Sequence, residues 1–156
     1  MTRDGARTVA ASVSLAMPGH LIRRLHQVST LVFHRHVQAA GHDITPVQFA
    51  ALDALAHNPE IDQKGLAELV AKDRATLGTV VERLEQKGLV TRRVSPDDKR
   101  ARVLALTPEG EALLAKLLPV VIALQKDILP GLDDDEYRQF VALASKVSAA
   151  ASAERR

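Results

Sequence analysis

Apolar residues recur at helical spacing over most of this chain, and the pattern predicts helices joined by short turns. The first helix is expected over residues 17–40 and the second over residues 46–57. Thr45 is placed as an N-cap, Pro46 as the first helical residue, and Gln48 as the capping-box partner. The N-terminal half therefore contains two helices, the second with a complete start signal.

A short helix and a longer one follow, separated by a polar turn. The short helix begins after Asp62 and is expected to place Leu66, Leu69 and Val70 on one apolar face. Asp73 has the side chain of an N-cap for the longer helix, which ends near Gly88. The longer helix repeats apolar residues at i, i+3, i+4 and i+7, and its stripe comprises Leu77, Val80, Val81 and Leu84.

A β-hairpin is predicted after these two helices. Two runs of strand-forming residues, 89–94 and 102–106, flank a turn that contains Pro96 followed by Asp97. Helix, turn, helix and hairpin, in this order, predict a winged helix-turn-helix. The ordinary use of that fold is to read duplex DNA.

The charge distribution agrees with nucleic-acid binding. Residues 64–102 contain ten basic and six acidic side chains, a net charge of +4, whereas the whole chain carries +2. Positive charge therefore gathers where phosphates would lie. A solvated surface around an ordinary hairpin would also explain the cluster, and so would a winged helix used only for protein–protein assembly.

Two further helices are expected after the hairpin. The first begins at Thr107-Pro108, carries a wide apolar band over residues 112–129 and contains Pro119, while Asp133 or Asp134 caps the last. We interpret the wide band as part of a subunit interface, with a larger intramolecular core as the alternative. The fold class is thus mostly α with a small hairpin wing. The expected regions are a flexible arm at 1–16, a helical dimerisation region at 17–43 and 108–156, and a winged domain at 44–107.

Several segments together resemble the multiple antibiotic resistance regulator (MarR) family of winged-helix repressors. They are Leu66-Ala-Glu-Leu69, residues 74–84, Lys87-Gly-Leu-Val90, Asp98-Lys99-Arg100 and Leu106-Thr107-Pro-Glu-Gly110. The resemblance covers roughly residues 18–150. It implies a homodimer with interlocked terminal helices, bound to a palindromic operator in double-stranded DNA.

The resemblance also implies which residues meet DNA. The helix from Arg74 would enter the major groove, and Arg100 at the wing tip would enter the minor groove with Asp98 orienting it. The complete predicted set is Arg74, Thr76, Thr79, Arg83, Arg92, Asp98, Lys99, Arg100 and Arg102.

The family resemblance further implies a small-molecule effector, possibly an aromatic acid. The cleft would lie between the first two helices, the dimerising helix and the DNA-binding lobe. A carboxylate there needs a cationic partner, and we predict Arg24, with His20 and Gln27 beside it. The alternative for Arg24 is a salt bridge across the dimer to Asp127 or Asp133.

Other chemistries find little support in the sequence. The absence of cysteine excludes disulfides and thiolate chemistry, and no enzyme motif, cofactor motif, membrane span or signal segment is recognised, so we expect a cytoplasmic non-enzyme. All six histidines fall between residues 20 and 57, which raises a metal-sensing alternative. However, His34 and His36 point about 200° apart on a helix, so we predict no metal site.

Overall fold

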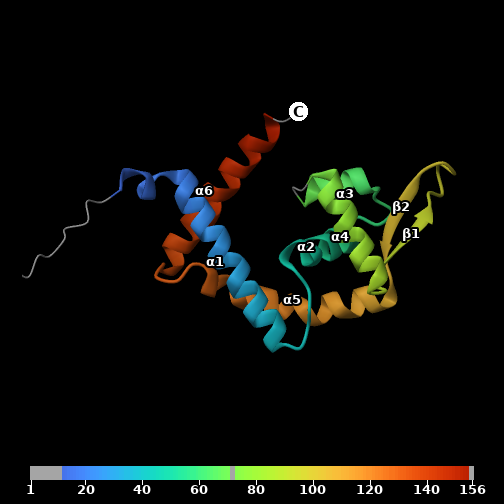
Figure 1. The fold of residues 1–156 in the computed structure, drawn as a ribbon, viewed down its shortest axis with the longest axis horizontal. Helices are drawn as coiled ribbons and strands as arrows, with labels where there is room; N and C mark the ends of the chain where they lie inside the picture. Colours follow the sequence, from blue (N-terminus) through green and yellow to red (C-terminus); the bar gives the residue numbers. More distant parts are fainter. Residues whose placement is uncertain (1–11, 71–72, 155–156) are drawn as a thin grey trace, which may run out of the picture.

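The computed structural model describes residues 12–70 and 73–154, and they form a helical molecule with one two-stranded sheet (Figure 1). The predicted fold class, mostly α with a hairpin wing, is confirmed. The elements are η1 (Val13–Ala16, a 3-10 turn), α1 (Pro18–Ala39), α2 (Pro46–His57), α3 (Gln63–Leu69), α4 (Arg74–Gln86), β1 (Val90–Val94), β2 (Arg102–Leu106), α5 (Pro108–Ile128) and α6 (Asp134–Ala153).

The expected N-terminal arm lies only partly within the described residues. Residues 1–11 lie outside them, while Val13–Ala16 form the 3-10 turn that precedes α1.

Side-chain caps set the helix starts that the sequence predicted. The Gln48 N–H donates to Thr45 Oγ1 at 3.2 Å, and the Thr45 N–H donates back to Gln48 Oε1 at 3.1 Å. Asp133 and Glu136 exchange the equivalent pair of bonds at the start of α6, each at 2.9 Å. Each reciprocal pair satisfies two backbone N–H groups that have no partner in an uncapped helix, so each helix begins at a defined residue.

The core of the winged lobe is aliphatic and collects one face from each of its elements. The side chains without exposed surface include Leu52 of α2, Leu66 of α3, and Leu77, Val81 and Leu84 of α4. The predicted stripe on α4 is confirmed, since its fourth member, Val80, is partly buried against the same core. The lobe is therefore held together by close packing of leucine and valine.

The predicted apolar face of α3 was wrong at one position. Leu69 is 54% exposed, whereas Ala67 is buried beside Leu66. At about 100° per residue, Leu66, Ala67 and Val70 span one arc, and Leu69 lies well outside its centre. The sequence pattern predicted that Leu69 faces the core, but Ala67 occupies that position in the structure.

The hairpin is antiparallel and is anchored at its base. Val90 pairs with Leu106, and Val94 pairs with Arg102. The Leu104 N–H donates to the Ile61 carbonyl at 2.8 Å, which forms an isolated antiparallel bridge beside β2. The ladder fixes the direction in which the wing leaves the lobe.

The junction between the hairpin and α5 is unusually close. The Thr107 hydroxyl donates to the Gly88 carbonyl at 2.6 Å, and the Thr107 N–H donates to the Leu89 carbonyl at 3.1 Å. A Cβ on Gly110 would lie 2.1 Å from the Leu89 oxygen, so only glycine fits there. The end of α4, the wing and α5 are thereby joined at one point.

The remaining helices form the other end of the molecule. α1 packs along α5, and His36 Nε2 lies 3.0 Å from the Asp127 carboxylate across that contact. α6 has no buried residue in the single chain, and Figure 1 shows it at the opposite end from the hairpin. The chain thus separates a packed winged lobe from an open helical one.

Candidate nucleic-acid interface

The start of α4 is fixed by Asp73, as the sequence predicted. Asp73 Oδ1 accepts the Thr76 N–H at 2.8 Å, and Oδ2 accepts the Thr76 hydroxyl at 2.5 Å. The hydroxyl and then the N–H of Thr76 hold the pKa of Asp73 below its ordinary value of 3.8. Thr76 therefore helps to build the helix start as well as lying on its outer face.

The predicted contacts on α4 lie on two sides of the helix. Thr76, Thr79 and Arg83 are exposed and follow each other at intervals of three and four residues, so they form one polar stripe. Arg74 is exposed as well, but nine residues separate it from Arg83, which places the two about 180° apart around the helix. Arg74 therefore belongs to the exposed first turn of α4 and not to the stripe.

The wing tip is folded by side-chain to backbone bonds. Ser95 Oγ accepts the N–H groups of Asp97 and Asp98 at 3.2 and 3.3 Å. Asp98 Oδ1 accepts the Arg100 N–H at 2.9 Å. Asp98 therefore orients Arg100 through its backbone, which leaves the guanidinium available for a partner.

Most of the predicted cations are unpaired within the part of the chain that the structure describes. Arg74, Arg83, Lys99, Arg100 and Arg102 make no salt bridge there, and all five are exposed. Arg92 differs, since its Nε lies 3.0 Å from Glu85 Oε2 and ties the first strand of the wing to α4. Five exposed cations without a salt bridge among the described residues thus lie on one helix and one hairpin, and each could contact a phosphate.

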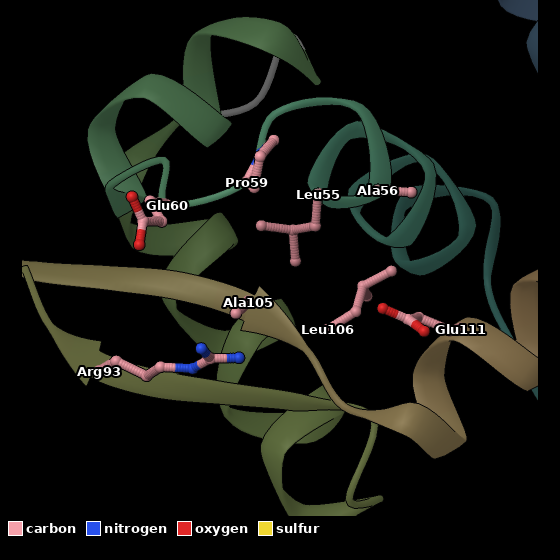
Figure 2. A pocket seen from close by; sticks show the side chains of 8 residues that line it. All are labelled: Leu55, Ala56, Pro59, Glu60, Arg93, Ala105, Leu106 and Glu111. Carbon is pink, nitrogen blue, oxygen red and sulfur yellow. The ribbon is translucent and has the colours of Figure 1, made fainter.

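Arg93 lies on the other face of the hairpin and does not join this surface. Figure 2 shows its side chain lying along β1, and it lines a cavity of about 310 Å³ together with Glu60 and Glu111. Leu55 and Leu106 form its apolar side. Neighbouring strand residues point to opposite faces, so Arg92 and Arg93 have different surroundings.

Sequence reasoning missed a polar cavity where α4 ends and α2 begins. It measures about 360 Å³, and its lining includes Arg83 together with Gln48, Gln86 and Lys87. The available signal was Lys87, four residues after Arg83 and thus on the same side of the helix. Gln48 was assigned only to the capping box.

The predicted effector residues lie along the first half of α1. Arg24 and Gln27 are exposed, and His20 Nδ1 lies 3.0 Å from Arg23 Nη2. A cavity of about 310 Å³ opens beside them between α1, α5 and α6, but none of the three residues lines it. Its lining is Leu25, His26, Ser29, Gln125, Ile128, Leu129, Tyr137, Phe140 and Val141. The structure thus groups the three on one helix without enclosing them.

Both carboxylates considered as partners of Arg24 are engaged within the protomer. Asp127 pairs with His36, and Asp133 caps α6.

The described residues contain neither a candidate metal site nor a membrane-spanning helix. Across residues 12–70 and 73–154, no three His, Cys, Asp or Glu side chains come together in a way that could hold a metal ion. Over the same residues, no helix is long and apolar enough to cross a membrane.

A capped and exposed polar helix beside a wing with a cationic tip defines a winged helix-turn-helix DNA-binding protein. Comparison with known proteins narrows the class. The model of the MarR family matches residues 42–101. The transcriptional regulator HosA of Escherichia coli O111:H- is 35% identical over 128 residues, which cover 80% of this chain and 94% of HosA. The chain belongs to the MarR family, whose members are transcriptional regulators and not enzymes.

Solved structures of similar proteins agree with the fold. PcaV of Streptomyces coelicolor, solved with its natural ligand, is 36% identical with a TM-score of 0.80, over 90% of this chain and 99% of PcaV. BpsR of Bordetella bronchiseptica, whose DNA binding is regulated by 6-hydroxynicotinic acid, is 29% identical with a TM-score of 0.80, over 86% and 94%. The repressor CouR, bound to a 23-mer DNA duplex, is 30% identical with a TM-score of 0.73, over 86% and 92%.

Proposed function

We propose that the protein is a cytoplasmic, homodimeric transcriptional repressor that binds a palindromic operator and is released by a small aromatic carboxylate. DNA binding and regulation follow from the family. The dimer, the palindrome, the direction of regulation and the effector class are our proposal.

The observation that carries the proposal is the surface formed by α4 and the wing tip. Thr76, Thr79 and Arg83 present hydroxyl and guanidinium groups along one side of α4, and Arg100 is held at the tip with no acidic partner among the described residues. Hydroxyl and guanidinium groups read base edges and phosphates, and an extended arginine fits a minor groove. Thus α4 would read one major groove while the wing enters the neighbouring minor groove.

The dimer is supported by apolar surface at the other end of the chain. Large apolar side chains are exposed on three helices there: Leu21, Ile22, Leu25, Val28 and Leu31 of α1, Leu118 and Ile122 of α5, and Phe140, Val141, Leu143 and Val147 of α6. We infer that many of these side chains belong to an apolar patch larger than a monomer usually leaves in water. A two-fold axis through it would present two copies of α4, about 34 Å apart, to successive major grooves.

The effector class is supported by the similar proteins and by α1. BpsR responds to an aromatic acid, and PcaV was solved with a ligand bound. Arg24 offers a guanidinium that accepts a carboxylate in a two-pronged geometry, on the helix that borders the proposed dimer interface. A ligand that binds better to one spacing of the two lobes would shift the population toward that spacing and release the operator.

The test is fluorescence anisotropy on the DNA upstream of the protein's own gene, with benzoate, 4-hydroxybenzoate and 6-hydroxynicotinate added singly. We expect one compound to release the wild-type protein. Arg24→Gln should bind DNA normally but need at least about tenfold more compound, because its carboxylate partner is gone. Arg35→Gln, at an exposed position about 16 Å further along α1, is the matched control.

Each other outcome removes a defined part of the proposal. An unchanged response of Arg24→Gln would remove Arg24 from the effector site. DNA binding that no compound relieves would remove the aromatic carboxylate. Binding no stronger than to random DNA would favour the protein–protein assembly module instead.

A further inference from the structure

The cavity between the end of α4 and the start of α2 is lined by polar side chains. Arg83, Gln86 and Lys87 approach it from α4, and Thr45 and Gln48 approach it from α2. Asp43 is the one carboxylate in the lining, so the cavity carries two cationic groups and one anionic group. Its volume of about 360 Å³ exceeds what one phosphate group needs.

Gln48 is the residue that points to a ligand. It is only 4% exposed, and its Oε1 is fixed by the Thr45 N–H at 3.1 Å. That bond assigns the other end of the amide as Nε2, for which no hydrogen-bond partner exists among the residues that the structure describes. No fully enclosed side-chain nitrogen or oxygen lacks a partner there, so Nε2 reaches the open space of the cavity. Its N–H groups are therefore available to an acceptor that enters the cavity.

The two cations beside Gln48 supply charge and further donors. The Lys87 ammonium contacts the Asp43 carbonyl and lies 3.6 Å from the Asp43 carboxylate, which positions it at the rim. An ammonium has three N–H donors, so Lys87 retains one for a ligand. Arg83 makes no salt bridge among the described residues and is exposed. An oxyanion would satisfy all three groups at once.

The position of the cavity relative to α4 indicates where the oxyanion comes from. α4 has 13 residues and is about 20 Å long, whereas the major groove is about 12 Å wide. A helix of this length lying across the groove meets a sugar–phosphate backbone beyond the bases. The stripe through Thr76, Thr79 and Arg83 leads directly to the cavity.

We propose that this cavity is an oxyanion site that takes a backbone phosphate of the bound DNA, with Gln48, Arg83 and Lys87 as its donors. The proposal rests on the proposed function and adds the start of α2 to the interface. A phosphate held between two elements would fix the angle at which α4 enters the groove, independently of base sequence.

The deciding variant is Gln48→Glu. Glutamate keeps the acceptor that the capping box requires, so the start of α2 is retained, but it replaces the Nε2 donor with a negatively charged oxygen. Ala56→Glu adds the same charge at the exposed far end of α2 and serves as the control. Circular dichroism melts show whether each variant is folded. Gln86→Glu, on the exposed side of α4 and in the same cavity, is the second variant should Gln48→Glu fail to fold.

DNA affinity is measured by anisotropy across a salt series, on the upstream duplex and on a random duplex. We expect Gln48→Glu to weaken both by about tenfold and to lower the salt slope by about one, since phosphate contacts carry no sequence information. Ala56→Glu should change either affinity by less than about twofold. Equal behaviour of the two variants would overturn the proposal.

A second measurement distinguishes failure of this site from failure of DNA binding itself. The side-chain amide resonance of Gln48 is followed by NMR while inorganic phosphate is added at constant ionic strength, without DNA. A saturating shift that Gln86→Glu abolishes supports an oxyanion site even if the wild-type protein binds no duplex. In that case a free anion replaces DNA as the source and the backbone assignment is wrong. No shift and no effect of Gln48→Glu on DNA would overturn the oxyanion site altogether.

Discussion

Single side chains set the geometry of the surface formed by α4 and the wing tip, and most of these side chains could be identified from the sequence. Asp73 and Thr45 were recognisable because a short polar acceptor before an apolar stripe is a strong local signal. Gln48 was only half understood, because a capping box predicts where its oxygen goes and not what its nitrogen faces. Local bonding can be read from sequence neighbours, whereas a cavity depends on residues 35 positions away.

The pKa of Asp73 predicts how the stability of α4 depends on pH. The Thr76 hydroxyl and N–H stabilise the ionised carboxylate, so its folded pKa lies below the ordinary 3.8. The stabilisation is therefore present above pH 3.8 and is lost as the pH falls through the lower folded pKa. Asp73→Asn keeps a cap acceptor without the titration.

We accordingly expect wild-type unfolding midpoints to exceed those of Asp73→Asn by a constant amount at pH 5 to 7. The difference should shrink below about pH 4. Urea denaturation at each pH is the measurement. A difference that grows on acidification would show that the carboxylate does not stabilise α4.

Arg100 tests the wing at the scale of one residue. Arg100→Ala should weaken operator binding by about tenfold and reduce the salt slope by about one, because a phosphate-lined groove contact and its counterion release are lost. Lys116→Ala on the exposed side of α5 removes the same charge elsewhere. A salt slope equal to that of Lys116→Ala would exclude a wing contact with phosphate.

The helix and strand elements were predictable where periodicity and caps agreed, and less so where packing decided. α2, α4, the hairpin and the start of α5 all begin where the sequence signals placed them. Leu69 was wrongly assigned to the core because helical periodicity alone does not distinguish the centre of an arc from its edge. The cavity at the C-terminal end of α4, lined by Arg83 and Lys87, could not be predicted from the periodicity of α4, because its other side is formed by the start of α2.

The junction of the hairpin with α5 gives a prediction at this scale. Gly110→Ala should lower the free energy of unfolding by about 3 kcal/mol, because the new Cβ meets the Leu89 carbonyl and the backbone must move. Gly19→Ala in α1 has no atom within 4 Å of its new Cβ, and should be neutral or stabilising by up to about 1 kcal/mol. Chemical denaturation measures both. Similar effects at the two glycines would refute the close junction.

The exposed apolar face of α6 is expected to lie in the dimer interface. Leu143 is 64% exposed in the single chain, and in the proposed dimer it is covered. Leu143→Asp should raise the dimer dissociation constant by roughly a hundredfold, because an unpaired charge would be buried. Ser145→Asp adds the same charge on the opposite side of α6. Sedimentation that shows both variants equally dimeric would place the interface elsewhere.

The whole molecule joins a winged lobe at one end to helices with exposed apolar side chains at the other. The sequence predicted both regions, since an amphipathic pattern reveals that a face is apolar. It did not reveal what covers α6, because a single chain contains no information on the position of a second copy. The predicted effector residues Arg24, His20 and Gln27 share this difficulty, since in the single chain no cavity encloses them and in the proposed dimer a second copy would lie nearby.

The proposed function requires that α4 and the wing together bind a specific operator. The most direct measurement is the fluorescence anisotropy of the wild-type protein on its upstream DNA and on a scrambled duplex of equal length, from 50 to 200 mM salt. We expect at least roughly a thousandfold preference for the upstream duplex, with log affinity falling linearly against log salt. Equal binding to both duplexes, or none to either, would contradict the claim.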